Sequence, residues 1–95
     1  MSGDERLVRY HFRAEGRVQG VWFRQSTREQ AEVLGVCGWV RNLPDGSVEG
    51  ILEGLPGPTS RLLAWLRQGP EHALVTRLSV EEEPPQGVQR FQVVG

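Results

Sequence analysis

Lysine is absent from this chain of 95 residues, and its eleven basic residues are all arginine. The missing ε-amino group excludes Schiff-base chemistry, attachment of pyridoxal phosphate and the lysine of a nucleotide P-loop. Cysteine is nearly absent too, because Cys37 alone cannot form an intrachain disulfide and no cysteine–histidine cluster has metal-ligand spacing. We therefore expect no cofactor, no bound metal and a reducing, cytoplasmic setting.

Long apolar runs and an excess of one charge are also missing. No run approaches the ~18–20 residues of a membrane span, and the first residues lack the basic and apolar regions of a signal peptide. The formal net charge of −1 does not favour a broad nucleic-acid surface. With 38% hydrophobic and 24% charged residues, we expect residues 1–95 to form a single folded domain, with no membrane or nucleic-acid partner.

The spacing of apolar residues divides the chain into strands and helices. Alternation of apolar and polar residues from Val8 onward predicts a first strand that ends at Gly16. Three further strands are predicted over 36–42, 47–53 and 74–80. Helical spacing predicts a helix over 23–34, stopped by Gly35, and a second helix that starts with Thr59 or Ser60 as its N-cap and ends before residue 69. Residues 81–85 are expected to be a solvated turn, and residues 88–94 a short final strand.

This order of elements is β-α-β-β-α-β with a short terminal strand. With right-handed crossovers it predicts an α+β fold, the ferredoxin-like sandwich, in which two helices cover one face of an antiparallel sheet. The fold hosts many unrelated functions, so function has to come from the motifs.

The loop over 16–21, with glycines four apart, lies between a strand and a helix. Glycine tolerates the positive φ values that point successive N–H groups into one concavity, and the helix adds its own unpaired N–H groups and positive dipole end. Arg24 in the first helical turn is placed to bind two oxygens of one anion. The other interpretation is a plain connecting loop, because the spacing matches no known nucleotide loop. An arginine at a helix start opposes the dipole, and an anion would remove that conflict.

Other residues allow two interpretations. Asn42, before the Asp45–Gly46 turn, is either a turn former or an amide that orients a water molecule. Cys37 is expected to be a small buried hydrophobe rather than a nucleophile, and His11 a solvated residue.

Two stretches resemble the signatures of the acylphosphatases. The family's phosphate cradle is similar to the stretch Gly16-Arg17-Val18-Gln19-Gly20-Val21-Trp22-Phe23-Arg24. The family's second signature is similar to Gly38-Trp39-Val40-Arg41-Asn42 together with Asp45-Gly46-Ser47-Val48-Glu49. The resemblance implies hydrolysis of acyl phosphates to a carboxylate and inorganic phosphate, without metal, by a small cytosolic monomer, with inorganic phosphate as product and inhibitor. It implies that Arg24 and Asn42 are the catalytic residues and that Asn42 positions the attacking water. Trp22 would then either shield the acyl group or just cover the loop. It also implies that the phosphate is held by Gly16, Arg17, Val18, Gln19, Gly20, Val21, Trp22 and Arg24.

The chemistry of these side chains limits the mechanism. Neither the guanidinium of Arg24 nor the amide of Asn42 can act as a general base near pH 7. We therefore expect in-line attack by water, with its proton passing to an oxygen of the substrate's own phosphate.

Three other functions compete with this one. A phosphate-binding module that has lost turnover would keep the cradle. An RNA-binding sheet of the same topology would need exposed aromatic side chains on its central strands, where Tyr10 and Phe12 instead have core parity. Hydrolysis of carbamoyl phosphate is implied by the similar N-terminal domain of hydrogenase-maturation proteins, whose cysteine-rich modules have no counterpart in these 95 residues.

Overall fold

Seven elements follow one another in the computed structural model, which describes residues 6–95. The first strand shows why the sequence predicts them: Phe12 and Ala14 are fully buried, whereas Arg13 between them is only half-buried, so the alternation is that of a strand with one core face. The elements are β1 (Val8–Arg17), α1 (Phe23–Leu34), β2 (Cys37–Asn42), β3 (Val48–Gly54), α2 (Pro56–Gln68), β4 (Leu74–Glu83) and β5 (Phe91–Val93).

The strands form one sheet in the order β4-β1-β3-β2-β5. β1 pairs antiparallel with β3 and β4, and β3 pairs antiparallel with β2, so the predicted ferredoxin-like arrangement is confirmed. The terminal strand β5 lies parallel to β2, with Gly38 opposite Phe91, and this makes the sheet mixed rather than wholly antiparallel.

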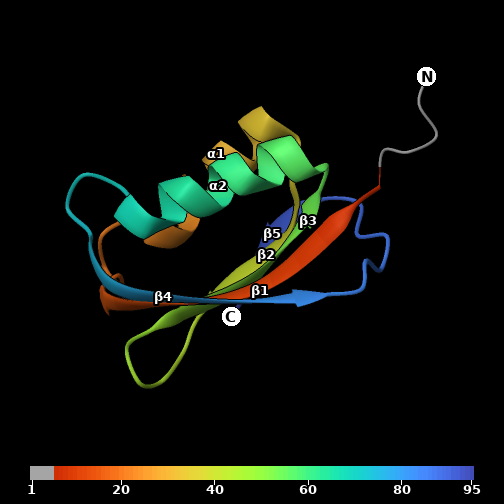
Figure 1. The fold of residues 1–95 in the computed structure, drawn as a ribbon. Coiled ribbons are helices and arrows are strands. Elements are labelled where there is room, and N and C mark those ends of the chain that lie inside the picture. The colour runs from red at the N-terminus through yellow and green to blue at the C-terminus, as the bar shows by residue number, and fades with distance from the viewer. Residues whose placement is uncertain (1–5) are drawn as a thin grey trace.

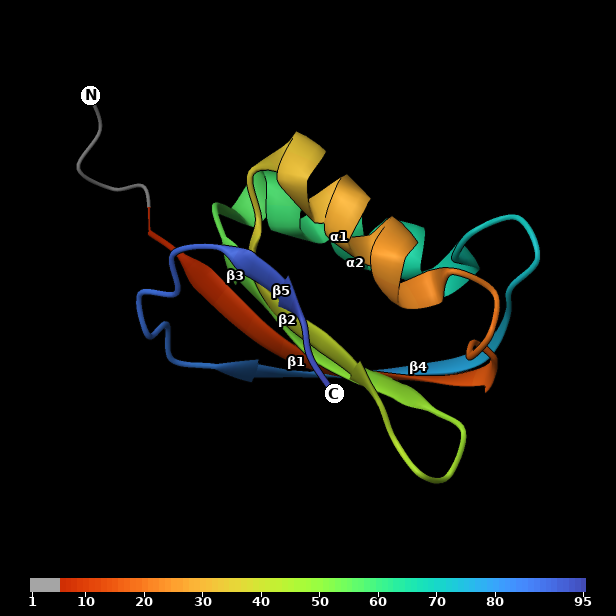
Figure 2. The same ribbon diagram turned by 180° about the vertical axis from the view of Figure 1, so that it is seen from behind.

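Both helices cover the same face of the sheet, and the other face is open (Figure 1). The view from behind shows β5 beside β2 and the loop between β1 and α1 at the end of the sheet where α2 runs into β4 (Figure 2). Neither helix in residues 6–95 is long and apolar enough to cross a membrane. The core between helices and sheet consists of Phe12, Ala14, Val18, Phe23, Ala31, Val36, Val40, Val48, Leu52, Leu62, Leu66 and Phe91.

The second helix begins earlier than predicted. It starts at Pro56 with Leu55 as the N-cap, so the prediction of Thr59 or Ser60 in that role is wrong. Proline fits the first turn because its missing N–H is not needed there and its φ is already helical. Thr59 instead lies inside the helix, where its N–H donates to the carbonyl of Leu55 at 3.1 Å and its side chain is fully buried.

Three strands run further than predicted, and β3 does so by one residue, to Gly54. β4 continues to Glu83, so the expected turn is wrong for residues 81–83: Glu81 and Glu83 lie opposite His11 and Arg9 of β1, and Arg9 forms an ion pair with Glu83 at 3.0 Å. β1 passes Gly16 through a β-bulge against β4. A side chain at Gly16 would place its Cβ 2.1 Å from the carbonyl oxygen of Leu74, so this crossing requires glycine.

Candidate functional site

The loop between β1 and α1 turns twice through the left-handed region. Gly20 has φ 75° and Trp22 has φ 62°, while Val21 between them has no positive φ, since Trp22 is the only such non-glycine residue in the described part of the chain. Alternation of this kind points successive N–H groups into a common concavity that suits an anion. The backbone from Gly20 to Trp22 therefore has the conformation that the predicted anion-binding loop requires.

The N-terminus of α1 is free of a side-chain cap. The first helical hydrogen bond runs from the N–H of Ser26 to the carbonyl of Trp22 at 2.9 Å, and no acidic residue lies in the first turn. The three N–H groups before Ser26 consequently have no partner within the helix. These N–H groups are a second set of donors for an anion, and the positive end of the helix dipole adds to the attraction.

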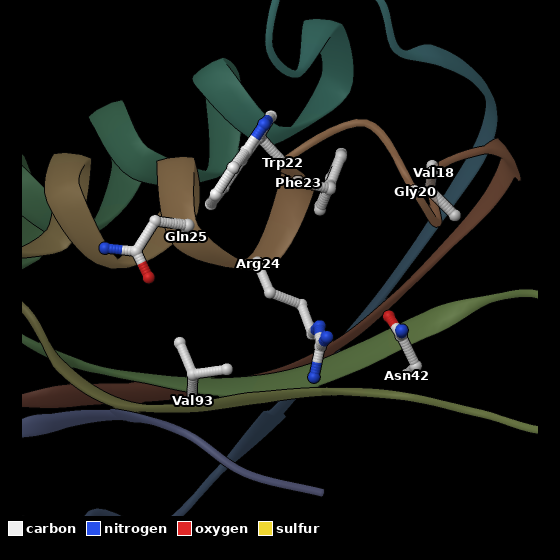
Figure 3. Close-up of a pocket in the computed structure, with 8 residues that line it drawn as sticks. All are labelled: Val18, Gly20, Trp22, Phe23, Arg24, Gln25, Asn42 and Val93. Atoms are coloured by element: carbon white, nitrogen blue, oxygen red, sulfur yellow. The ribbon is translucent and has the colours of Figure 1, made fainter.

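Arg24 and Asn42 come from different elements and face one another. Arg24, in the first turn of α1, extends its guanidinium toward the sheet, and Asn42, the last residue of β2, lies next to it (Figure 3). None of the ion pairs found within residues 6–95 involves Arg24. The Oδ1 atom of Asn42 is buried and accepts no hydrogen bond from any described residue. A cation and an acceptor thus remain available at one place.

A cavity of about 320 Å³ lies between α1 and the sheet at this point. Its volume is at the lower end of the range for small-molecule sites. Arg24 and Asn42 supply its charged and amide groups, and apolar side chains supply much of the remaining wall. It is lined by Val18, Gly20, Trp22, Phe23, Arg24, Gln25, Asn42 and Val93 (Figure 3).

Gln19 fastens the loop to the β2–β3 hairpin. Its Nε2 donates to the carbonyl oxygens of Leu43 at 2.8 Å and Ser47 at 2.9 Å. The turn is closed by Asp45, which accepts hydrogen bonds from the N–H and hydroxyl of Ser47 at 2.9 and 2.6 Å. These bonds, with the nearby Arg13 guanidinium, hold the pKa of Asp45 below its ordinary value. Because Asn42 immediately precedes this turn, the bonds of Gln19 fix its position relative to the loop.

The structure brings together only part of the predicted phosphate-binding set. Val18, Gly20, Trp22, Arg24 and the predicted catalytic Asn42 line the cavity. Four other predicted residues do not, and each has a different environment. Gly16 occupies the bulge beside β4, Arg17 is exposed at the end of β1, the side chain of Gln19 binds the hairpin, and Val21 packs against the core.

Three residues of the cavity wall were not predicted as site residues. Phe23 and Gln25 belong to the first turn of α1 and follow from the position of the helix start. Val93 comes from β5, about fifty residues beyond Asn42, and no local signal connects it with the loop. Within residues 6–95, no three side chains of histidine, cysteine, aspartate or glutamate come together as a metal site would require.

The open face of the sheet is occupied by ion pairs. His11 lies 2.8 Å from Glu49, contrary to the expectation of a merely solvated residue, and Arg41 pairs with the same carboxylate at 2.6 Å. The His11 hydrogen bond holds the pKa of Glu49 below its ordinary value, against the opposing effect of burial. Phe12 is fully buried on the other face, and Arg41 lies over the ring of Trp39. The arrangement gives no support to the RNA-binding interpretation.

Comparisons with known proteins agree with this geometry. A family model described as acylphosphatase matches residues 10–93. An acylphosphatase of Thermococcus kodakarensis is 54% identical over 88 residues, which cover 93% of this chain and 97% of that protein. The solved structure of an acylphosphatase from Coxiella burnetii superimposes with a TM-score of 0.91 at 35% identity and covers 98% of this chain and 100% of that one. The acylphosphatase structure from Bacillus subtilis gives 0.89 at 34% identity, covering 93% and 99%. The chain therefore belongs to the acylphosphatase family of hydrolases.

Proposed function

We propose that this chain hydrolyses the carboxyl–phosphate bond of acyl phosphates by attack of a water molecule held at Asn42 on a phosphate held at Arg24. The observation that carries the proposal is the meeting of two unpartnered groups in one cavity. The guanidinium of Arg24 has no acidic partner within residues 6–95, and the buried Oδ1 of Asn42 has no donor there. A phosphate dianion would pair with the guanidinium of Arg24, and a water molecule would donate a hydrogen bond to Oδ1 of Asn42.

The phosphate is bound by backbone donors and one guanidinium. The loop around Gly20 and the first turn of α1 direct N–H groups to the cavity, and Arg24 adds a planar pair of donors. Each charge-assisted hydrogen bond contributes about 1.5–3 kcal/mol. Several such bonds retain a single phosphate group, and the positive charge at the phosphate comes from Arg24 rather than from lysine, which the chain lacks.

The water is oriented by the amide of Asn42. Oδ1 accepts one O–H of the water, which leaves a lone pair of the water oxygen directed at phosphorus. The new O–P bond forms as the bond from phosphorus to the carboxylate oxygen breaks in line with it, and the water proton passes to a phosphate oxygen. The leaving carboxylate takes the electron pair and needs no protonation near pH 7. Catalysis consequently rests on positioning and on fixed hydrogen-bond donors.

The test is hydrolysis of benzoyl phosphate in the presence of a metal chelator. Wild-type protein is expected to remain active, and Asn42→Ala is expected to lose roughly 10²–10³ in kcat, as for loss of one preorganised group at a transition state. Arg24→Ala is expected to lose binding of inorganic phosphate, measured as the rise in Tm that phosphate causes. Arg28→Ala, one turn further along α1 and exposed, is the matched control and should behave as wild type. Full activity of Asn42→Ala, or a requirement for added divalent metal, would refute the proposal.

The proposal also covers the domain organisation, oligomeric state, location and product inhibition of the protein. We infer a single acylphosphatase-like domain over residues 1–95 that works as a cytoplasmic monomer and is inhibited by its product, inorganic phosphate. One continuous hydrophobic core supports the single domain, and the single cysteine supports a reducing compartment. Light scattering on the purified protein should give the mass of one chain, and inorganic phosphate should raise the apparent KM for benzoyl phosphate without changing kcat.

A further inference from the structure

Trp22 has an unusual position for a large aromatic residue. It is the N-cap of α1, its backbone is left-handed at φ 62° and ψ 23°, and 77% of its surface is exposed. A residue with a Cβ is strained in this conformation, whereas glycine adopts it freely. The indole recovers little by packing in the core, because most of it remains in solvent. Folding alone therefore does not explain a tryptophan here, and such an outlier points to function.

The cavity has a polar side and an apolar side. Asn42 lies at one end, and the indole of Trp22 lies at the other, beside Gln25, with Arg24 between them (Figure 3). Val93 of β5 contributes an aliphatic wall below the indole (Figure 3). A phosphate at Arg24 would thus have an amide on one flank and an exposed aromatic ring with an aliphatic neighbour on the other.

In-line displacement assigns an occupant to each flank. The attacking and leaving oxygens lie on opposite sides of phosphorus. If the water is at Asn42, the carboxylate and the group attached to it leave on the side of Trp22. From this geometry we infer that Trp22 and Val93 form the acyl-group subsite and that Trp22 makes the enzyme favour flat aromatic acyl phosphates over small aliphatic ones. This inference rests on the proposed placement of phosphate and water.

The indole suits such a group for two reasons. Tryptophan offers a large, rigid face with only two side-chain torsions to fix, so little conformational entropy is lost on contact. Offset or edge-to-face contact between two aromatic rings also adds to the effect of area alone. An acetyl group has no ring and would gain almost nothing from the same contact.

The experiment compares benzoyl phosphate with acetyl phosphate in kcat/KM, taking the ratio so that the intrinsic reactivities cancel between variants. Trp22→Ala should lower the benzoyl-to-acetyl ratio about fivefold, the effect of one aromatic contact. Trp22→Phe should keep most of the ratio. Val33→Ala removes another exposed apolar side chain of α1 that does not line the cavity, and it should leave both substrates unchanged. Equal loss of both substrates in Trp22→Ala would overturn the inference, since it would indicate a role in loop shape alone.

A measurement on wild-type protein does not depend on any variant. Phenacylphosphonate and acetonylphosphonate are analogues of benzoyl and acetyl phosphate in which CH₂ replaces the bridging oxygen, so they differ in the group that would occupy the subsite, and phenacylphosphonate should be the stronger competitive inhibitor by several-fold. Equal inhibition constants would refute the subsite. Failure of the proposed function is distinguishable, because it would appear as an inactive wild type or an active Asn42→Ala, whereas failure of the subsite leaves an active enzyme with an unchanged substrate ratio.

Discussion

Replacement of Glu53 by glutamine should strongly destabilise the fold, although the residue lies far from the cavity. Its side chain is 1% exposed and forms an ion pair with Arg9 at 2.9 Å. It also accepts backbone hydrogen bonds from Gln86, Gly87 and Val88 at 3.0, 2.6 and 3.1 Å. One buried carboxylate therefore holds both β1 and the loop between β4 and β5.

The size of the effect follows from what glutamine cannot do. Its –NH₂ group is a donor placed among donors, and the buried guanidinium of Arg9 loses its full counter-charge. Loss of one partner of a buried pair costs about 3–5 kcal/mol. Arg9 retains a second carboxylate, Glu83, at 3.0 Å, so we expect a value near the lower limit, about 3 kcal/mol. This is a large share of the roughly 5–15 kcal/mol that stabilises a domain.

The assay is urea unfolding at pH 7, with Glu83→Gln as the matched control. Glu83 binds the same arginine but is 36% exposed, so its replacement should cost no more than about 1 kcal/mol. If Glu53→Gln were no more destabilising than Glu83→Gln, the reasoning about burial would be refuted.

The same pair of proteins gives a pH dependence. Burial alone would raise the pKa of Glu53, but the N–H group of Gln86, the Arg9 guanidinium and the adjoining N–H groups bring it below the ordinary 4.5. A carboxylate whose pKa is lower in the folded state stabilises the fold above the unfolded value, and this contribution is lost as pH falls through the folded pKa. The stability gap between wild type and Glu53→Gln should accordingly be constant near neutrality and narrow below about pH 4.5.

Three further changes test the site and the sheet. Gln19→Leu removes both hydrogen bonds to the hairpin, so kcat should fall at least several-fold through misplacement of Asn42, while phosphate still raises Tm; an unchanged kcat would contradict the positioning role. Asn42→Asp puts a negative charge beside the phosphate and should abolish the Tm rise that Asn42→Ala preserves. Gly38→Ala would place a Cβ 1.8 Å from the carbonyl oxygen of Ile51 at φ 140°, so the variant should lose at least ~3 kcal/mol in urea unfolding, and wild-type stability would refute the clash.

Local signals predicted the helices and strands well, and the exceptions have physical causes. Residues 81–83 were predicted to lie in a solvated turn because a sequence does not show which strand will pair with a segment. In the structure they pair with β1 over residues 9–11 and continue β4. Leu55 gives no capping signal, and Pro56 starts α2 through its fixed φ rather than through a side-chain hydrogen bond. These errors concern where elements begin and end, because such limits depend on tertiary partners.

Local signals alone left the roles of Arg24 and Asn42 open, and the family resemblance supplied the predicted site. The structure places both residues at one cavity, and their roles there stay a prediction. Val93 was not predictable, because its position follows from the parallel pairing of β5 with β2. The buried state of Glu53 was not predictable either: its parity places it on the open face, and only the returning loop over 86–88 covers it.

The parallel strand β5 also has a consequence for aggregation. It occupies the outer edge of β2 through hydrogen bonds from Gly38 N–H to the carbonyl of Arg90 and from Val94 N–H to the carbonyl of Val40, both at 2.9 Å. An uncovered strand edge is a template for pairing with another chain. β5 thus covers the edge of β2, the strand that carries Trp39 and Val40, and leaves a strand of only three residues as the edge of the sheet on this side. Since Glu53 accepts hydrogen bonds from the loop that leads into β5, we expect Glu53→Gln to loosen this cover and to aggregate more readily at high concentration than Glu83→Gln.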